Sequence, residues 1–165
     1  MSSFKTIAER NEIINLFGQQ VSPEIVDALL KQKPDPIIQK RSVCIMFLDI
    51  RNFTPFAAMH TPEEIIAYQN AVFGFMIDII NGHHGIINQF LGDSFTSTFG
   101  APLSFGNDCR NVVEAALAII ARLKQENDNG NIPPTRVGIG IHAGEVVAGN
   151  VGSSLRKQYS ITGIE

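Results

Sequence analysis

The sequence predicts an α+β domain of the ferredoxin-like βαββαβ class, an antiparallel sheet with helices on one face. A wholly apolar segment at residues 43–48 is too short for a helix core and is typical of a strand buried on both faces. An alternating polar and apolar hairpin covers residues 86–99, and two long stretches with helical periodicity separate the strands. Strand, helix, hairpin, helix and strand in this order give the βαββαβ pattern. We place this domain at residues 41–165.

Residues 1–40 are expected to form a separate N-terminal helical segment and linker. The stretch ERNEIINLF places two isoleucines and Phe17 on one helical face, and Ser22-Pro23 offers a cap and a first-turn proline for a second helix. The linker KQKPDPIIQK, residues 31–40, carries two prolines, and we expect no regular structure there.

The two longer helices and the last strand are predicted from caps and periodicity. TPEE at residues 61–64 is a capping box with proline at the first helical position, and HHG closes that helix. A second helix is expected from about Asn107. The stretch TRVGIGIHAGEVVAGNVG, residues 135–152, is interpreted as a strand, a turn and a second short strand.

Composition and charge narrow the function classes. A net charge of −3 with scattered basic residues gives no electrostatic basis for nucleic-acid binding. The only cysteines, Cys44 and Cys109, are far apart in the sequence, so we expect no disulfide framework and a reducing, cytoplasmic compartment. No apolar run approaches the length needed to cross a bilayer, and the start lacks a signal-peptide core. A membrane anchor in a longer parent protein is invisible to this reasoning.

Two aspartates fall at the ends of predicted strands. Asp49 ends the buried first strand, and Asp93 lies at the hairpin tip in NQFLGDSF. If the first strand pairs beside the hairpin, the two carboxylates converge and repel unless a cation holds them; Mg²⁺ or Mn²⁺ suits such oxygen ligands. The turn IRNFT then offers backbone N–H groups to a phosphate. This combination indicates phosphoryl or nucleotidyl transfer by two metal ions.

Each of these residues also has an ordinary structural explanation. An aspartate after a strand is commonly a helix cap, and Gly-Asp at a hairpin tip is common turn chemistry. The stretch GIGIHAG lacks the spacing of a dinucleotide-binding loop and is expected to serve close strand packing. His83-His84 is expected to end a helix rather than bind metal, and Cys44 to lie in the core. The functional interpretation therefore depends on the combination of signals.

That combination resembles the class III adenylate/guanylate cyclase catalytic domain. The segments FLDIRNFT, INQFLGDSFTSTFGAP, GIGIHAGEVVAGNVGS and QYSITG carry the resemblance in this order and spacing, over roughly residues 41–165. The segment FGQQVSPEIVDALL resembles the transducing segment that often precedes such domains in bacterial proteins. An upstream sensor domain in a longer parent protein fits this resemblance.

The resemblance implies a site with two Mg²⁺ or Mn²⁺ ions. Asp49 and Asp93 would be the catalytic metal ligands, with the carbonyl of Ile50 as a further ligand. One ion would lower the pKa of the ribose 3′-hydroxyl, and the other would bind the triphosphate of ATP or GTP. Attack on the α-phosphorus closes the 3′,5′-cyclic phosphate and expels pyrophosphate, and alignment and charge neutralisation lower the barrier.

The resemblance also implies how the substrate is held. The phosphate-facing backbone would come from Asn52, Phe53 and Thr54. Arg136 lies two residues from the position of a phosphate-binding arginine found in some members. Gln89 falls where adenylate cyclases usually carry a base-reading Lys and guanylate cyclases a Glu, and Ser160 falls at the second base-reading position. ATP and cAMP are therefore expected over GTP and cGMP.

Members of this family pair head to tail, so a homodimer is implied in which one domain supplies the metals and the other the base readers. The 18% charged residues suit a buried dimer face.

The family's Asn and Arg, spaced N-x-x-x-R, are expected just after residues 161–163. The chain stops at Glu165, and we expect this chain alone to be inactive. One alternative is an inactive cyclase-homology module for dimerisation or regulation, favoured by Gln89 and by the missing Asn and Arg. Another is a diguanylate cyclase or polymerase-palm relative, whose hairpin should read GGDEF or GGEEF rather than FLGDSF.

Overall fold

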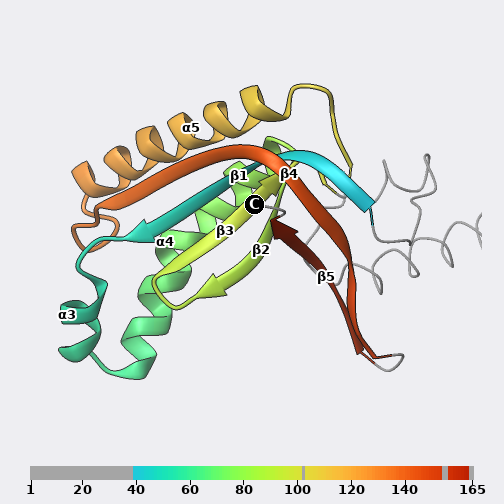
Figure 1. Ribbon diagram of the computed structural model, residues 1–165. Coiled ribbons are helices and arrows are strands. Elements are labelled where there is room, and N and C mark those ends of the chain that lie inside the picture. Colours follow the sequence, from blue (N-terminus) through green and yellow to red (C-terminus); the bar gives the residue numbers. More distant parts are fainter. Residues whose placement is uncertain (1–38, 102, 154–155, 164–165) are drawn as a thin grey trace, which may run out of the picture.

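The computed structural model describes residues 39–101, 103–153 and 156–163, and within them the side chains of residues 40–147 (Figure 1). A five-stranded antiparallel sheet has the order β2-β3-β1-β4-β5. Its strands are β1 Gln39–Ile50, β2 Gly85–Leu91, β3 Ser94–Phe99, β4 Val137–Ser153 and β5 Arg156–Gly163. The helices are α3 Phe53–Ala58, α4 Pro62–Gly82 and α5 Asp108–Asp128. This arrangement confirms the predicted α+β class, and the helical segment expected within residues 1–38 lies outside the described residues.

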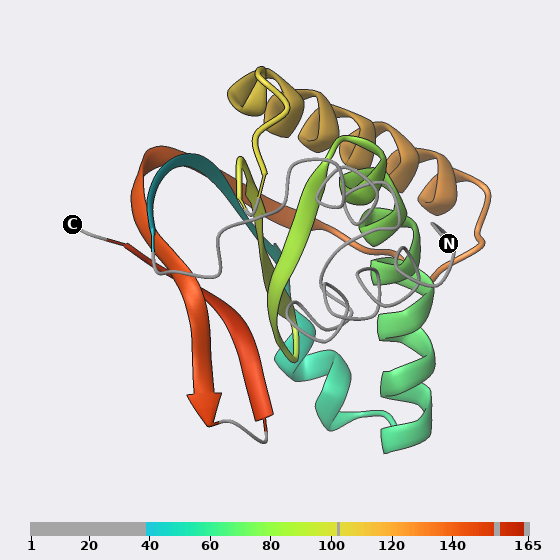
Figure 2. The same ribbon diagram turned by 90° about the vertical axis from the view of Figure 1, so that its right-hand side faces the viewer.

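β1 lies in the centre of the sheet and separates a buried face from an open one. It pairs antiparallel with β3 on one side and β4 on the other. Alternate β1 side chains join the core shared with α4 and α5: Cys44, Met46, Leu48 and Ile50. Phe47 between them is 56% exposed, so the expectation that this strand is buried on both faces is wrong. Figure 2 shows α4 and α5 together on one side of the sheet, which leaves the other face uncovered by them.

The two long helices begin and end close to where the sequence predicts. The Thr61 side chain accepts a hydrogen bond from the N–H of Glu64 at 3.2 Å, which caps α4, and His83 is its C-cap. α5 begins at Asp108, directly after Asn107. Five side chains of α4 are buried against the sheet and α5: Tyr68, Val72, Phe73, Met76 and Ile80.

The length of α4 corrects one expectation. By length and composition alone this helix is long and apolar enough to cross a membrane, although no apolar run of that length was expected. The sequence reasoning missed it because polar residues interrupt the apolar ones along the chain. In the structure five side chains of this helix are buried, and the helix packs on β2 and α5.

β4 corrects a second expectation, because residues 137–153 form one continuous strand rather than two short strands with a turn between them. Its first part pairs with β1 and its last part pairs with β5, so each part is hydrogen-bonded to a different partner. In both ribbon views the outer part of β4 and β5 extend away from the sheet as a hairpin (Figures 1 and 2). β1 also starts at Gln39, inside the stretch expected to be an irregular linker.

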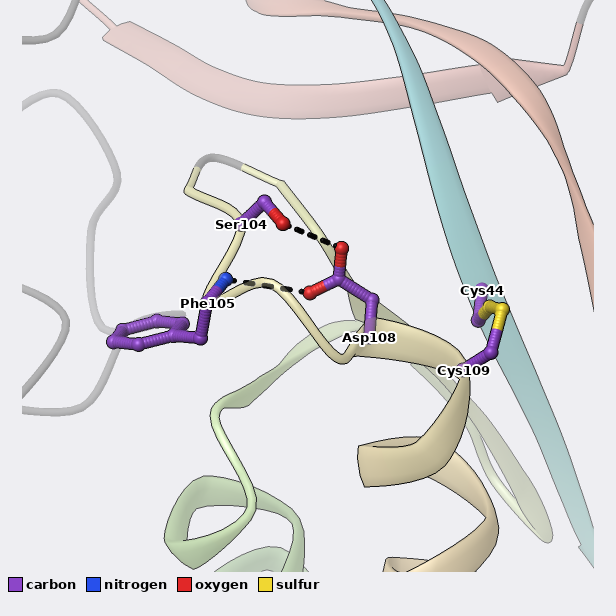
Figure 3. Close-up of a disulfide and its surroundings, with 5 residues drawn as sticks. All are labelled: Cys44, Ser104, Phe105, Asp108 and Cys109. Atoms are coloured by element: carbon purple, nitrogen blue, oxygen red, sulfur yellow. Dashed lines mark hydrogen bonds between the residues drawn. A yellow bond between two sulfur atoms is a disulfide. The ribbon is translucent and has the colours of Figure 1, made fainter.

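The expectation that the two cysteines form no disulfide is wrong, because Cys44 and Cys109 are joined by one. Cys44 is 2% exposed in β1, as expected for a core residue, and Cys109 lies in the first turn of α5 (Figure 3). A separation of 65 residues in the sequence did not indicate proximity. The fold packs the start of α5 directly on β1 and brings the two Cα atoms to 5.5 Å.

Candidate active site

The two aspartates come together at the end of β1. Asp49 pairs with Ser94, the first residue of β3, and the N–H of Ile50 donates to the carbonyl oxygen of Asp93 at 2.8 Å. Asp93 lies with Gly92 in the turn between β2 and β3, as predicted. The backbone of one aspartate is therefore one residue step from that of the other, although 44 positions separate them in the sequence.

The chain makes a tight turn directly after Asp49 and Ile50. The N–H of Arg51 donates to the carbonyl oxygen of Arg136 at 2.8 Å, and Asn52 has a left-handed backbone with φ 56° and ψ 32°. Asparagine tolerates this conformation better than most residues. α3 follows at once, with Phe53 and Thr54 in its first turn, where backbone N–H groups have no partner within the helix. The turn thus places the first turn of α3 directly after the two aspartates.

β4 completes the site from the other side of β1. Its Gly138 pairs with Asp49 and donates its N–H to Oδ1 of that residue at 3.1 Å. A cavity of about 400 Å³ opens here on the end of β1, with Asp49, Arg51, Ser94 and Gly138 in its lining. The cavity is large enough for cations and part of a phosphorylated small molecule.

A buried polar network fixes the segment that leads into β4. The hydroxyls of Tyr68 and Thr135 lie 2.6 Å apart, and the Asn127 side chain bonds both the N–H and the carbonyl of Thr135, at 2.9 and 2.8 Å. Burial raises the pKa of the Tyr68 phenol, and its hydrogen bond to Thr135 partly opposes that rise. Residue 136 is thereby held next to the turn after β1, and the exposed Arg136 lies at the same end of the sheet as the aspartates.

The two expected base-reading residues lie at different distances from Asp49. Gln89 is exposed in β2 and pairs with Thr96, which pairs with Phe47, so these three share the open face. Gln89 lies two strand spacings across the sheet and two residues along it from Asp49, a distance of roughly 12 Å. Ser160 lies in β5 opposite Gly149 of β4, and its side chain is outside the described residues. From Gly138 to Gly149 is roughly 35 Å along the strand, so one copy of the chain does not bring Ser160 to the aspartates.

The donor set fits a hard divalent cation that keeps some of its water. Two carboxylates and nearby backbone carbonyls are oxygen donors, and Mg²⁺ is commonly held by one or two carboxylates together with waters and substrate phosphates. Among the described residues there is no cluster of three or more His, Cys, Asp or Glu that would form a closed metal cage. The pair Asp49 and Asp93 therefore suits a site that is completed by an anionic substrate.

Sequence reasoning missed several residues that build this site. Arg51 and Gly138 both contact the Asp49 side chain, whereas Tyr68, Asn127 and Thr135 act through the backbone that precedes β4. A signal for Gly138 was present in the sequence, since glycines alternate with apolar residues in VGIGI and a strand glycine often marks a close approach. The glycines were assigned to strand packing, and the approaching group was not identified.

Comparisons with known proteins agree with this geometry. Residues 36–164 match the family model described as the adenylate and guanylate cyclase catalytic domain. An uncharacterized protein of Mycobacterium tuberculosis (strain ATCC 25618 / H37Rv) is 32% identical over 157 residues, which cover 95% of this chain and 28% of that protein. The chain thus spans under a third of the length of the curated relatives it matches.

Solved structures show the same likeness. The guanylyl cyclase Cya2 is 35% identical with a TM-score of 0.71, and the match covers 77% of this chain and 66% of that one. The adenylyl cyclase CyaB from P. aeruginosa is 28% identical with a TM-score of 0.68, over 78% of this chain and 69% of that one. A bacterial light-regulated adenylyl cyclase shares the fold at 24% identity, with a TM-score of 0.74 over 99% of this chain and 48% of that one.

Proposed function

Because the chain belongs to the adenylate and guanylate cyclase catalytic domain family, we propose that it is the catalytic domain of a nucleotide cyclase that acts on ATP in preference to GTP. Its products are a 3′,5′-cyclic nucleotide and pyrophosphate. The observation that carries this proposal is the meeting of the Asp49 and Asp93 backbones at the end of β1, beside a cavity and the first turn of α3. Core packing does not require two carboxylates at this exposed strand end.

The residues at the end of β1 have separate tasks in this proposal. Asp49, Asp93 and the carbonyl of Ile50 would hold two Mg²⁺ or Mn²⁺ ions, which would acidify the ribose 3′-hydroxyl and neutralise the triphosphate. The backbone from Asn52 to Thr54 binds phosphate oxygens through the N–H groups of the turn and first helical positions. The 3′-oxygen loses its proton and bonds to the α-phosphorus, and the bond to the pyrophosphate oxygen breaks.

Arg136 adds a positive charge at the same end of the sheet in this proposal. It is exposed, and its backbone is fixed both by Arg51 and by the network around Thr135. A cation held in this way can follow the negative charge that builds on the leaving pyrophosphate. In this proposal Arg136 stabilises charge on the phosphates, and other residues select the base.

A head-to-tail homodimer is part of the proposal. Ser160 lies too far along β4 to reach the aspartates of its own chain, so a second copy has to bring its base reader to the site. The open face that carries Asp49 also exposes Phe47 and Leu91, each 56% exposed, which are apolar groups that a partner can cover. We assign Gln89 and Ser160 of one copy to the purine bound at the metals of the other.

The preference for adenine over guanine and the cellular location of the protein are also proposals. Of the three similar structures above, one is a guanylyl cyclase and two are adenylyl cyclases, so likeness alone does not favour a base. The expectation of ATP comes from Gln89, which lacks the carboxylate that reads guanine. A cytoplasmic location is proposed from the nucleotide substrate alone, because the disulfide between Cys44 and Cys109 removes the argument from unpaired cysteines. This location leaves room for a sensor or an anchor elsewhere in the natural full-length protein.

The test is metal-dependent turnover in the natural full-length protein. Asp49→Asn and Asp93→Asn should each lower cyclic nucleotide formation from Mn-ATP by more than about a hundredfold, because each removes an anionic metal ligand. Both sites are at least partly exposed, so the free energy of unfolding should change by less than about 0.5 kcal/mol. Asp78→Asn, at an exposed position of α4, is the matched control and should retain full activity.

Pyrophosphate release and cyclic product are measured together with both Mn-ATP and Mn-GTP. Normal turnover in either site variant would show that the carboxylates are only cap and turn residues. A wild-type protein that folds, dimerises and forms no product from either nucleotide would instead favour an inactive cyclase-homology module that serves dimerisation or regulation.

A further inference from the structure

The Asp49 carboxylate is held by groups that metal coordination does not require. Its Oδ1 accepts the N–H of Gly138 at 3.1 Å and lies 3.9 Å from Nε of Arg51. The hydrogen bond and the ion pair of Asp49 found among the described residues both involve Oδ1, which leaves Oδ2 for a cation. Arg51 is itself anchored, because its N–H donates to the carbonyl oxygen of Arg136.

The absence of a side chain at Gly138 leaves room for this arrangement. A Cβ at position 138 would lie 2.6 Å from Oδ1 of Asp49 and 2.5 Å from Nη2 of Arg51, closer than carbon and these atoms approach in proteins. The missing side chain is therefore filled by the carboxylate and the guanidinium. Gly140 lies two residues along the same strand and at the rim of the same cavity, yet a Cβ there would meet nothing within 4 Å.

We propose that Gly138 and Arg51 are positioning residues for Asp49, and that Arg51 holds the place of the metal ion until the ion binds. This inference rests on the proposed metal-binding role of Asp49. The backbones of Asp49 and Asp93 lie side by side at one strand end, and two carboxylates that share a cation site repel each other before the cation binds. The guanidinium of Arg51 supplies that positive charge, and the Gly138 N–H keeps Oδ1 in one orientation.

The two residues have opposite effects on metal affinity in this scheme. Gly138 favours the ion, because it keeps the carboxylate where Asp93 can share the ligand shell. Arg51 competes with the ion, because its positive charge has to leave the carboxylate or remain beside a second cation. Its competition is modest, since the side chains of Arg51 and Asp49 are 61% and 51% exposed and water screens the pair.

The first experiment measures Mn²⁺ binding to the natural full-length protein without nucleotide, by the electron paramagnetic resonance signal of free Mn²⁺. Gly138→Ala should weaken binding by more than about tenfold, whereas Gly140→Ala should change it by less than about twofold. Both variants place the same methyl group in the same strand, so a general effect of alanine on β4 would appear equally in the two. Equal Mn²⁺ affinities in the two variants would overturn the role of Gly138.

The second experiment tests Arg51 and does not depend on how well position 138 accepts a side chain. Arg51→Gln should tighten Mn²⁺ binding by about three- to fivefold at low ionic strength, the scale of an exposed ion pair. The gain should shrink in 0.5 M NaCl, because salt screens exposed charges. Arg110→Gln, which removes an exposed arginine paired with Glu114 on α5, is the matched control and should leave Mn²⁺ affinity unchanged. Unchanged or weaker binding in Arg51→Gln would overturn the placeholder role.

Asp49→Asn separates this inference from the proposed function. If that variant binds Mn²⁺ as tightly as the natural protein, Asp49 is not a metal ligand and both the proposed site and this inference are wrong. If it loses Mn²⁺ while Gly138→Ala matches Gly140→Ala, the metal site stands and the positioning role of Gly138 is wrong.

Discussion

The two faces of β1 differ in their surroundings, since one packs in the core and the other is open to solvent. On the helix-covered face, Cys44, Met46, Leu48 and Ile50 are at most 4% exposed, and Cys44 is also tied covalently to α5. On the open face, Phe47 is 56% exposed and Asp49 ends the strand with a carboxylate held by one backbone N–H and one arginine. Neighbouring residues of one strand therefore experience a packed core on one side and water on the other.

This difference predicts which property of the protein a substitution on each face of β1 should change. A change on the covered face removes buried contacts or a crosslink, so it should lower the free energy of unfolding. A change on the open face removes no core contact, so its effect should appear in assembly, metal affinity or substrate choice. Four substitution experiments can test whether stability effects belong to the covered face and functional effects to the open face.

The largest effect is expected from the crosslink on the covered face. Cys109→Ser opens a loop that spans 65 residues of sequence. The chain-entropy model gives about 4 kcal/mol of stabilisation for a crosslink that closes a loop of this length. We expect the free energy of unfolding to fall by that order, measured by urea denaturation of the oxidised protein. Serine is nearly isosteric and position 109 is exposed, so packing changes contribute little.

Reductant supplies the control for that measurement. Dithiothreitol should lower the stability of the natural protein towards that of Cys109→Ser and should leave the variant unchanged. A natural protein that is insensitive to reductant would show that the disulfide between β1 and α5 contributes no stability.

The second prediction concerns packing on the same covered face. Leu48→Ala removes a side chain that is 1% exposed and lies in the central core cluster, and should lower the free energy of unfolding by about 3 kcal/mol. Phe47→Ala, on the open face of the same strand, is the matched comparison and should lower it by less than about 1 kcal/mol. Equal losses in urea denaturation would contradict the division between the faces.

The sequence was sufficient to predict what depends on local pattern and strand order. The strand at residues 43–48, the hairpin and the capping box at Thr61 each reflect a local preference, and all appear in the structure. The run of apolar residues at 43–48 did not show that one face of the strand is open, because Phe47 is apolar and yet 56% exposed. The approach of Asp49 to Asp93 was also predictable, since in the βαββαβ order the first strand can pair beside the hairpin, as it does here.

The remaining features depend on contacts between distant segments. The disulfide requires the start of α5 to lie on β1, and the continuity of β4 requires two different partner strands, neither of which a local pattern encodes. The role of Gly138 depends on which side chains fill the space beside it. A sequence pattern identifies an unusual glycine, but only the fold shows what approaches it.

The third prediction moves to the open face and concerns assembly. Phe47→Ala should raise the dissociation constant of the proposed homodimer by more than about tenfold, since buried aromatic anchors dominate many interfaces. Sedimentation velocity over a range of protein concentrations measures this change. Leu117→Ala is the control, because Leu117 is 61% exposed on α5 and lies on the helical side of the sheet. If both variants weaken the dimer equally, or neither does, the open face is not the interface.

The smallest effect is expected from Gln89, which shares the open face with Phe47 and Thr96. An amide can present either its NH₂ to the N1 acceptor of adenine or its C=O to the N–H donors of guanine. A single neutral hydrogen bond discriminates by roughly 1 kcal/mol, which is less than about tenfold. We therefore expect the natural full-length protein to favour ATP over GTP only weakly in kcat/KM.

Charged substitutions at the same position should sharpen that weak preference in opposite directions. Gln89→Lys offers only donors and should strengthen the preference for ATP, whereas Gln89→Glu offers only acceptors at neutral pH and should shift it towards GTP. Because Gln89 is exposed and far from the core, neither change should alter the urea denaturation curve, so any change in kcat/KM reports on the site. The measurement compares kcat/KM for both nucleotides in all three proteins. A natural selectivity above about a hundredfold that neither substitution moves would mean that Gln89 does not contact the base, since a single neutral hydrogen bond cannot supply it.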